Sequence, residues 1–236
     1  MDVSARQRRS HSTKMEYSCF RIDPQTQLLP RLAQNYKALR LSALKQSPNS
    51  FSSTYEIESR FPDEWWESRL QLPRRETFIC VAKGDSSSAD EWVAQVTLIG
   101  PVTASSYRLP EAAQQPPVGL DEEEEKWQML SLYTLPTHRG KGIAKALCSE
   151  TFRWLQEAAT DKPRPGLIRV RIMVKPENVA TVKLYQALGF TDAGRCTLAE
   201  ALIANGDEAL VPADGGGHRF QDRTGLIMDM SLHRHE

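Results

Sequence analysis

The sequence has few cysteines and no close pairs of them. Its four cysteines are Cys19, Cys80, Cys148 and Cys196, and no CxxC motif brings two of them together. A zinc site or a disulfide framework needs cysteines at short, regular spacings. The spacing therefore argues against both, and we expect no metal site. It favours buried, reduced thiols in a protein of the cytoplasm or nucleus.

Net charge and long apolar runs are also missing. Lys plus Arg and Asp plus Glu each number 30, so no overall charge attracts nucleic acid or an anionic membrane. No run approaches the roughly 18 apolar residues of a membrane-spanning helix. Residues 1–16 carry basic side chains without an apolar segment behind them, which is not a secretory signal. We expect a disordered tail over 1–16 and a cytoplasmic protein, with the nucleus as the alternative.

Residues 17–236 alternate between helical and strand-like patterns. Apolar spacings of three, four and seven predict helices, and segments rich in β-branched and aromatic residues predict strands. The expected helices lie near 28–47, 62–70, 143–158 and 178–188. The expected strands lie near 19–25, 77–84, 91–101, 127–135, 166–174, 190–198 and 225–233. This order predicts one α/β domain with a mixed sheet, helices on its faces and a Gly-rich insertion at about 199–224.

Two features of this pattern concern loops and faces. Residues Asp121–Glu125 are five consecutive acids, which are typical of a solvated loop within the Pro-rich stretch 103–126. In the strand near 166–174, Ile168 and its alternate neighbours form an apolar face, while Arg169 and Arg171 point to the other side. The loops 103–126 and 199–224 are candidates to cover one side of a site.

The stretch YTLPTHRGKGIAKALCSETFRWL, residues 133–155, joins a strand to an amphipathic helix through a glycine turn. A nucleoside-triphosphatase loop needs a Ser or Thr hydroxyl for magnesium, but Gly142 is followed by Ile143. A dinucleotide-binding turn needs a third glycine where Lys145 stands, and an acid at the end of the next strand. That strand ends near Val174 without an acid, so both interpretations fail.

A phosphate cradle of another kind explains every feature of the turn. The first N–H groups of the helix point into the turn, where the helix dipole is positive. Gly140 and Gly142 let the backbone approach an anion without a Cβ in the way. Arg139 and Lys141 add formal charge, and Ile143 begins the buried side of the helix. The turn therefore predicts a site for a pyrophosphate group.

The hexapeptide Arg139-Gly140-Lys141-Gly142-Ile143-Ala144 resembles the acyl-CoA signature of the GNAT N-acetyltransferase superfamily. Asn178 and the segment KLYQALGF at 183–190 resemble the later block of that family, and residues 43–70 are similar to its substrate-side helices. The resemblance covers roughly 17–198 and the last strand. It implies a central mixed β-sheet of six to seven strands flanked by about four helices, with acetyl-CoA as cosubstrate.

The resemblance also implies roles for individual residues. The backbone of Leu132, Tyr133 and Thr134 is expected to pair with the pantetheine arm between two splayed strands, like an added strand. The turn from Arg139 to Ala144 is expected to bind the pyrophosphate. Asn178 is first a helix N-cap, and the resemblance adds a contact to the cofactor arm. Tyr185 is expected to protonate the departing thiolate as a general acid.

The expected reaction is direct attack of a neutral primary amine on the thioester in a ternary complex, without a covalent enzyme intermediate. Many relatives place a glutamate on the fourth strand, but this strand reads Gln128 to Tyr133 without a carboxylate. A water chain anchored by Ser131 and Tyr133, or a remote acid, is then the base. Cys148 is expected on the buried side of the cofactor helix, and His138 is expected to be a turn residue.

A small-molecule amine is the favoured acceptor. The alternatives are a protein lysine or N-terminal acetyltransferase and, from another class, a noncatalytic acyl-CoA-binding module. Among partners we expect an amine substrate, no nucleic acid and no membrane. The resemblance adds a homodimer as an open option, because the last strands often mediate dimers in the family.

Overall fold

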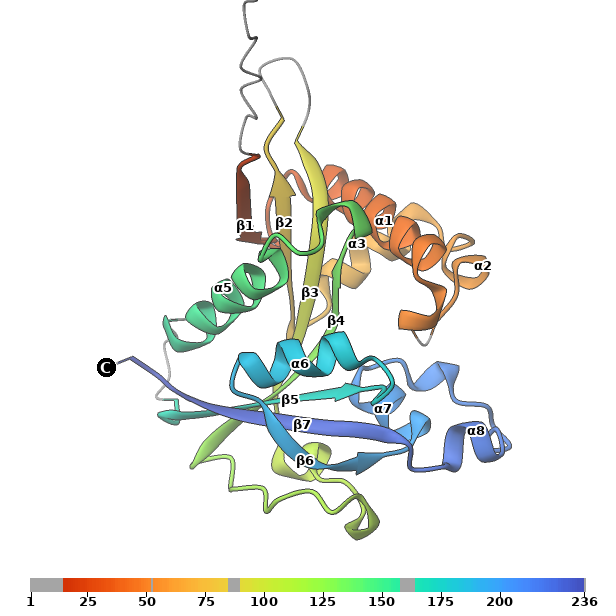
Figure 1. The fold of residues 1–236 in the computed structure, drawn as a ribbon, viewed down its shortest axis with the longest axis vertical. Coiled ribbons are helices and arrows are strands. Elements are labelled where there is room, and N and C mark those ends of the chain that lie inside the picture. Colours follow the sequence, from red (N-terminus) through yellow and green to blue (C-terminus); the bar gives the residue numbers. More distant parts are fainter. Residues whose placement is uncertain (1–14, 52, 85–89, 158–163, 236) are drawn as a thin grey trace, which may run out of the picture.

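A computed structural model of the protein describes residues 15–51, 53–84, 90–157 and 164–235. Nearly all of the expected N-terminal tail lies outside these residues, as does most of the loop at 84–90. The described chain forms one seven-stranded sheet with the order β1-β2-β3-β4-β5-β7-β6. Figure 1 shows the sheet running through the molecule, with helices on both of its faces.

The strands confirm the predicted mixed sheet. Only β4 and β5 are parallel neighbours, and every other pairing in the described sheet is antiparallel. The strands are β1 Tyr17–Arg21, β2 Arg75–Ala82, β3 Glu91–Val102, β4 Glu124–Thr134, β5 Leu167–Val174, β6 Thr191–Cys196 and β7 Gly225–His233. All seven match expected segments, with shifts of a few residues at their ends.

Four helices of nine residues or more match the four that the periodicity predicts. They are α1 Leu29–Gln46, α3 Asp63–Gln71, α5 Ile143–Glu157 and α6 Val179–Ala187. Shorter helices occur in the connections: α2 Tyr55–Glu58, α4 Ala104–Tyr107, α7 Leu198–Ala204 and α8 His218–Gln221. The last two lie in the expected insertion at 199–224, which therefore contains more regular structure than its glycines indicate.

Two apolar cores lie on opposite faces of the sheet. Helices α5 and α6 contribute Leu147, Leu155 and Tyr185 to a core that includes Phe78 and Val96. Helices α1 and α3 pack on the other face, where the core is built from Tyr36, Leu39, Trp66, Ile79, Val81 and Tyr133. In Figure 1 α5 and the α1–α3 group accordingly lie on opposite sides of β2 and β3.

The predicted alternation of β5 is confirmed. Ile168, Val170 and Ile172 are buried in the core that contains α5 and α6. Arg171 points to the opposite face, where its guanidinium lies 3.9 Å from the ring of Tyr107 and donates to the Tyr107 carbonyl at 2.6 Å. The loop at 103–123 thus covers part of that face.

We expected the acidic run Asp121–Glu125 to be a solvated loop, but only its first part is exposed. Its last two members, Glu124 and Glu125, begin β4 and are only 2% and 6% exposed. The carboxylate of Glu125 accepts a hydrogen bond from Trp127 Nε1 at 3.1 Å and forms ion pairs with Arg164 and Arg234. Composition alone suggests that Glu125 is solvated. Two arginines that are distant in the sequence but adjacent in the fold neutralise its carboxylate and allow it to be buried.

Replacing Glu125 tests the contribution of this network to stability. Burial alone would raise the pKa of Glu125, but Arg164, the Trp127 hydrogen bond and Arg234 outweigh it and hold the pKa below the usual 4.5. A pKa that is lower in the folded state stabilises the fold above about pH 4.5, and this stabilisation is lost as the pH falls through the lowered value.

We expect Glu125→Gln to reduce the free energy of unfolding at neutral pH by about 2 kcal/mol, less than the roughly 3–5 kcal/mol for fully buried pairs. The reduction is smaller because Arg164 and Arg234 keep 14% and 15% exposure. Urea unfolding at several pH values measures the effect, and the exposed neighbour Glu122, changed to Gln, is the control. A difference between wild type and Glu125→Gln that stays constant from pH 7 to pH 3 would contradict this account.

Candidate functional site

The central feature of the candidate site is the point where β4 and β5 stop pairing. The parallel ladder joins Glu124–Gln128 to Leu167–Arg171 and ends there. Beyond it, β4 continues to Thr134 beside β3, and β5 continues to Val174 beside β7. One edge of β4 after Gln128 therefore faces an opening in the sheet instead of a neighbouring strand. Such an edge presents backbone donors and acceptors to a ligand.

A bulge lies at the beginning of this open edge. Ser131 has φ +57°, and the β3–β4 register shifts by one residue between Gln95 and Thr97. After the bulge, Tyr133 pairs with Gln95 and Thr134 pairs with Ala94. A bulge bends its strand and increases the local twist. The structure thus places the predicted Leu132, Tyr133 and Thr134 in the part of β4 that has only β3 as a neighbour.

The glycine turn lies between β4 and α5. Gly140 and Gly142 have φ +74° and +78°, a region that L side chains rarely adopt. A Cβ placed on either glycine would have no atom within 4 Å, so the turn has free space on that side. Lys141 is exposed, Ile143 is buried as the first residue of α5, and Ala144 is half-buried. This geometry fits the predicted anion cradle at a helix N-terminus.

Arg139 differs from the other residues of the turn. Its Nε donates to the Thr134 carbonyl at 3.0 Å and its Nη2 donates to Ser47 Oγ at 3.2 Å. The guanidinium also lies 5.3 Å from the ring centre of Tyr133. In this structure the charge of Arg139 therefore reaches back toward the end of β4 and α1. Direct binding of phosphate by this guanidinium would require these hydrogen bonds to break.

The Arg139 contacts include a residue that the sequence analysis did not single out. Ser47 follows the C-terminus of α1, and its hydroxyl contacts Tyr133 Oη at 3.0 Å as well as Arg139. Phe51 packs on Tyr133 with ring centres 5.3 Å apart. Neither residue carries a motif, because their position depends on how α1 packs on a distant part of β4.

Asn178 and Tyr185 lie at the start and the end of α6. The expected side-chain cap is wrong, because Asn178 occupies the N-cap position but its side chain forms no cap hydrogen bond. Its carbonyl instead accepts from Thr181 N and Val182 N, both at 3.0 Å. Asn178 as a whole is half-buried, and its side chain is not used to cap the helix. Gly189, just past the end of α6, has φ +99°.

Tyr185 lies in the core beside the open edge. It is 5% exposed and belongs to the large apolar cluster against which Leu132 of β4 and Val174 of β5 also pack. Its ring packs on Phe190 at 5.3 Å. Burial, followed by the influence of Cys148, raises the pKa of Tyr185 well above its usual value. The phenol therefore keeps its proton at neutral pH.

Cys148 and His138 are both buried residues in structural surroundings. Cys148 is on the buried side of α5, as expected, and burial raises the pKa of its thiol to about 12. His138 lies in a short 3-10 helix of residues 136–138 and is 5% exposed. Its Nδ1 contacts Tyr17 Oη at 3.1 Å and its Nε2 lies 3.3 Å from Glu91 Oε2. Both ring nitrogens therefore have structural partners.

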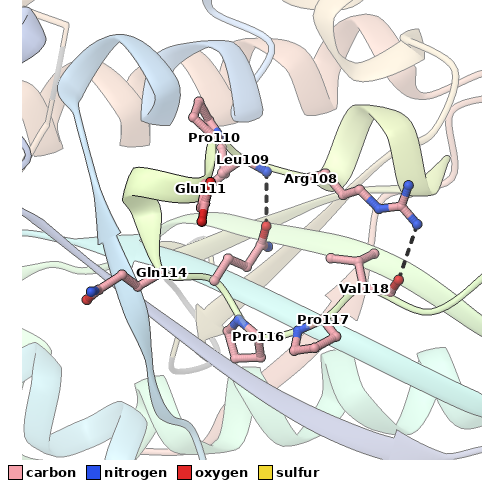
Figure 2. Close-up of a pocket in the computed structure, with 9 residues that line it drawn as sticks. Arg108, Leu109, Pro110, Glu111, Gln114, Pro116, Pro117 and Val118 are labelled. Carbon is pink, nitrogen blue, oxygen red and sulfur yellow. Dashed lines mark hydrogen bonds between the residues drawn. The ribbon is translucent and has the colours of Figure 1, made fainter.

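A hollow of about 460 Å³ lies elsewhere, within the loop 108–118 (Figure 2). The loop closes around it through Leu109 N, which donates to Gln115 Oε1 at 3.0 Å, and Arg108 Nη2, which donates to the Val118 carbonyl at 3.4 Å. Its lining comes only from this loop, so none of the residues around the open edge of β4 takes part in it.

Two searches of the described residues bear on other classes of site. Within those residues, no cluster of three or more His, Cys, Asp or Glu side chains has an arrangement able to hold a metal ion. None of the helices that the structure describes has the length and apolarity needed to span a membrane. The four cysteines are free thiols, and all but Cys19 are buried.

A mixed sheet that opens between parallel β4 and β5, with a glycine turn and a helix after β4, is the architecture of acyl-CoA-dependent acetyltransferases. The model of the acetyltransferase (GNAT) family matches residues 42–190. The chain belongs to this family. It is an N-acetyltransferase that uses acetyl-CoA as the acetyl donor.

Solved structures share this fold at low sequence identity. A GNAT-family acetyltransferase from Streptococcus pneumoniae has a TM-score of 0.55 and 14% identity, over 92% of this chain and 99% of that chain. Arabidopsis thaliana NAA60, solved in complex with acetyl-CoA, has a TM-score of 0.52 and 17% identity, over 92% of this chain and 99% of that chain. An Acinetobacter baylyi protein described as a putative acetyltransferase has a TM-score of 0.53 and 14% identity, over 93% of this chain and 95% of that chain. No curated protein sequence matches this chain significantly.

Replacing Gly142 by Val tests whether the turn binds acetyl-CoA. A β-branched side chain at φ +78° costs about 1–2 kcal/mol of strain and fills the free side of the turn. We expect the Kd for acetyl-CoA, measured by calorimetry, to rise at least about tenfold.

Gly217→Val is the matched control for this change. Gly217 also has a positive φ, +63°, and no atom within 4 Å of a Cβ, but it lies at the start of α8. Both variants should unfold at a lower temperature than wild type, but Gly217→Val should leave the Kd for acetyl-CoA unchanged. Equal affinities for acetyl-CoA in both variants would show that the turn is not the cradle.

Proposed function

We propose that the enzyme transfers the acetyl group of acetyl-CoA to a primary amine of a small molecule, by direct attack in a ternary complex. The observation that supports a small acceptor is the cover over the sheet face that carries α1 and α3. Arg75 and Gln128 on that face bind Asn205 in the insertion at 199–224, at 3.1 and 3.2 Å. Arg69 of α3 pairs with Asp207 of the same insertion at 3.4 Å.

A second segment covers the same face further along the sheet. Tyr107, from the loop at 103–123, packs on Arg171, and Arg171 in turn donates to Gln128 at 2.8 Å. Both loops therefore reach the neighbourhood of Gln128, where the opening between β4 and β5 begins. Such a cover leaves less room for an extended peptide across this face than for a compact amine.

Acetyl-CoA supplies an activated acetyl thioester. For the protein's part, we infer that backbone groups of Leu132, Tyr133 and Thr134 hold the pantetheine arm along the open edge of β4, and that a backbone N–H of this strand polarises the carbonyl oxygen. The turn from Arg139 to Ala144 binds the pyrophosphate, mainly through N–H groups at its glycines and the start of α5. The side chain of Asn178, which does not cap α6, is available to the arm.

Tyr185 acts in this proposal as the hydrogen-bond donor to the departing thiolate. An ordinary thiol has a pKa of about 8.5 and an ordinary tyrosine about 10, so full proton transfer from the phenol is uphill, and burial makes it more so. A neutral phenol nevertheless stabilises a developing thiolate through a charge-assisted hydrogen bond. The burial of Tyr185 thus keeps the proton where the leaving group needs it.

Deprotonation of the amine does not use a β4 carboxylate. The carboxylates of β4 are Glu124 and Glu125, which are committed to ion pairs at the opposite end of the strand. We propose a water chain anchored by Ser131 and the Tyr133 hydroxyl. The guanidinium of Arg139 beside Tyr133 favours the neutral form of a nearby amine, because like charge lowers the pKa of an ammonium group.

Changing Tyr185 to Phe tests the role of the hydroxyl. We expect kcat to fall by about a hundredfold or more, as for loss of one hydrogen-bond donor to a developing negative charge, with the Kd for acetyl-CoA unchanged. Tyr17→Phe is the control, because the Tyr17 hydroxyl contacts His138 at the edge of the sheet. Unchanged kcat in Tyr185→Phe would remove Tyr185 from the mechanism.

The acceptor class is tested by measuring thiol release from acetyl-CoA with two panels. One contains small primary amines of varied length and charge, and the other contains peptides with a free N-terminus or an internal lysine. We expect turnover with members of the first panel that exceeds turnover with every peptide. Turnover confined to peptides would instead favour the alternative of a protein lysine or N-terminal acetyltransferase.

A further inference from the structure

Four buried polar atoms without partners lie in the layer between the sheet and helices α1 and α3. Arg40 Nη1, Trp66 Nε1 and both amide atoms of Gln95 have no hydrogen-bond partner among the described residues. These residues are 7%, 0% and 0% exposed. Unpaired buried polar groups are costly and few in native proteins. Their concentration in one layer indicates a partner that the described chain does not supply.

Sheet register and core contacts place these side chains in the same layer. Arg40 comes from α1 and Trp66 from α3. Gln95 is opposite Ile79 on one side and Tyr133 on the other, and both of these pack in the core that contains Trp66. Directly opposite residues in a sheet point to the same face. Gln95 therefore faces the α1 and α3 helices.

The same layer contains more positive than negative charge. Arg40 donates Nε and Nη2 to the two oxygens of Glu58, at 2.9 and 2.6 Å, which leaves Nη1 on the other edge of the guanidinium. Arg69 pairs with Asp207. Within each of these two ion pairs the charges cancel, so any further cation in the layer is an excess charge.

Arg75 is that further cation. It is 7% exposed, and its Nη2 donates to the uncharged Asn205 carbonyl at 3.1 Å. No described carboxylate lies within ion-pair distance of its guanidinium. Burial, followed by the charge of Arg69 and more weakly that of Arg40, lowers the pKa of Arg75 to about 10, although Tyr36 and Asp207 act in the opposite direction. The three arginines thus share two carboxylates.

This layer borders the part of β4 where we place the reaction. The guanidinium of Arg40 lies 4.4 Å from the ring centre of Phe51, and Phe51 packs on Tyr133. Gln95 is the ladder partner of Tyr133. The unpaired donors therefore adjoin Tyr133, on the side of the sheet opposite the α5 helix.

We propose that the acceptor is an amine that also carries one carboxylate, and that Arg40, Arg75 and Gln95 bind this carboxylate while the amine faces the open edge of β4. This inference rests on the proposed function, because it describes the acceptor of the same reaction. A carboxylate compensates the charge of Arg75, which has no ion-pair partner of its own in this buried layer. The guanidinium edge of Arg40 suits the planar carboxylate.

Binding of matched probe pairs tests the proposal without requiring turnover. The probes are glycine, β-alanine, γ-aminobutyrate and ε-aminocaproate, each compared with its carboxamide. Calorimetry is performed with the full chain in the presence of coenzyme A, so that no acetyl transfer takes place. We expect at least one carboxylate probe to bind about tenfold or more tightly than its carboxamide, as for loss of a hydrogen bond to a charged group.

Two variants assign that preference to this layer. Arg75→Met removes the excess charge, and Gln95→Leu removes an unpaired amide at similar volume. We expect both to reduce the preference for the carboxylate to about twofold or less. Gln95→Leu should also unfold at a higher temperature than wild type, which shows that it folds. Arg153→Gln, an arginine of α5 whose side chain is 56% exposed, is the control and should keep the preference.

Three results would overturn the inference: no carboxylate probe binds, both members of every pair bind equally, or the preference survives in both Arg75→Met and Gln95→Leu. The result is separable from the proposed function. Turnover of small amines without a preference for a carboxylate would leave the function standing and remove this inference. Arg75-dependent carboxylate binding without acetyl transfer to any amine would remove the proposed function and leave only a carboxylate-binding site in this layer.

Discussion

The end of the pairing between β4 and β5 is the constraint on which the site depends. Five residues of β4 pair with β5, and the ladder stops at Gln128 and Arg171. Those two side chains are hydrogen-bonded to each other at 2.8 Å, so the last pair is fixed where the strands begin to separate. The bulge at Ser131 then bends β4 while β3 keeps hold of its other edge. An open strand edge is normally a liability, and here we propose it as the binding surface for the pantetheine arm.

The two faces of the sheet carry different groups of residues around this opening. On one face, α5 begins directly after the glycine turn, and α6 brings Tyr185 to the apolar cluster beside Leu132. On the other face, α1 and α3 enclose Arg40, Trp66 and Gln95, each of which has a buried polar atom without a hydrogen-bond partner within the described chain. Tyr133 and Arg139 connect the two sides, because the Arg139 guanidinium reaches from the turn to the end of β4 and to Ser47.

Local periodicity predicted much of the fold, and spacing predicted part of the site. The four main helices and the seven strands follow from local patterns. The burial of Glu125 does not, because its arginine partners are distant in sequence. The same holds for the partners of Arg139 and for the burial of Gln95, which depend on helix packing and strand register. Asn178 shows a different limit, since its residue type indicates a side-chain cap that its backbone conformation does not form.

Hydrogen exchange with and without acetyl-CoA tests the central claim most directly, namely that the open edge of β4 and the turn before α5 hold the cofactor. The account predicts slower exchange of amides in residues 131–135 and in the first turn of α5 when acetyl-CoA is bound, because both become hydrogen-bonded. Amides of α7 and α8 should be unaffected by acetyl-CoA alone. Protection that appears elsewhere in the chain, with exchange at 131–135 and at the start of α5 unchanged, would contradict it.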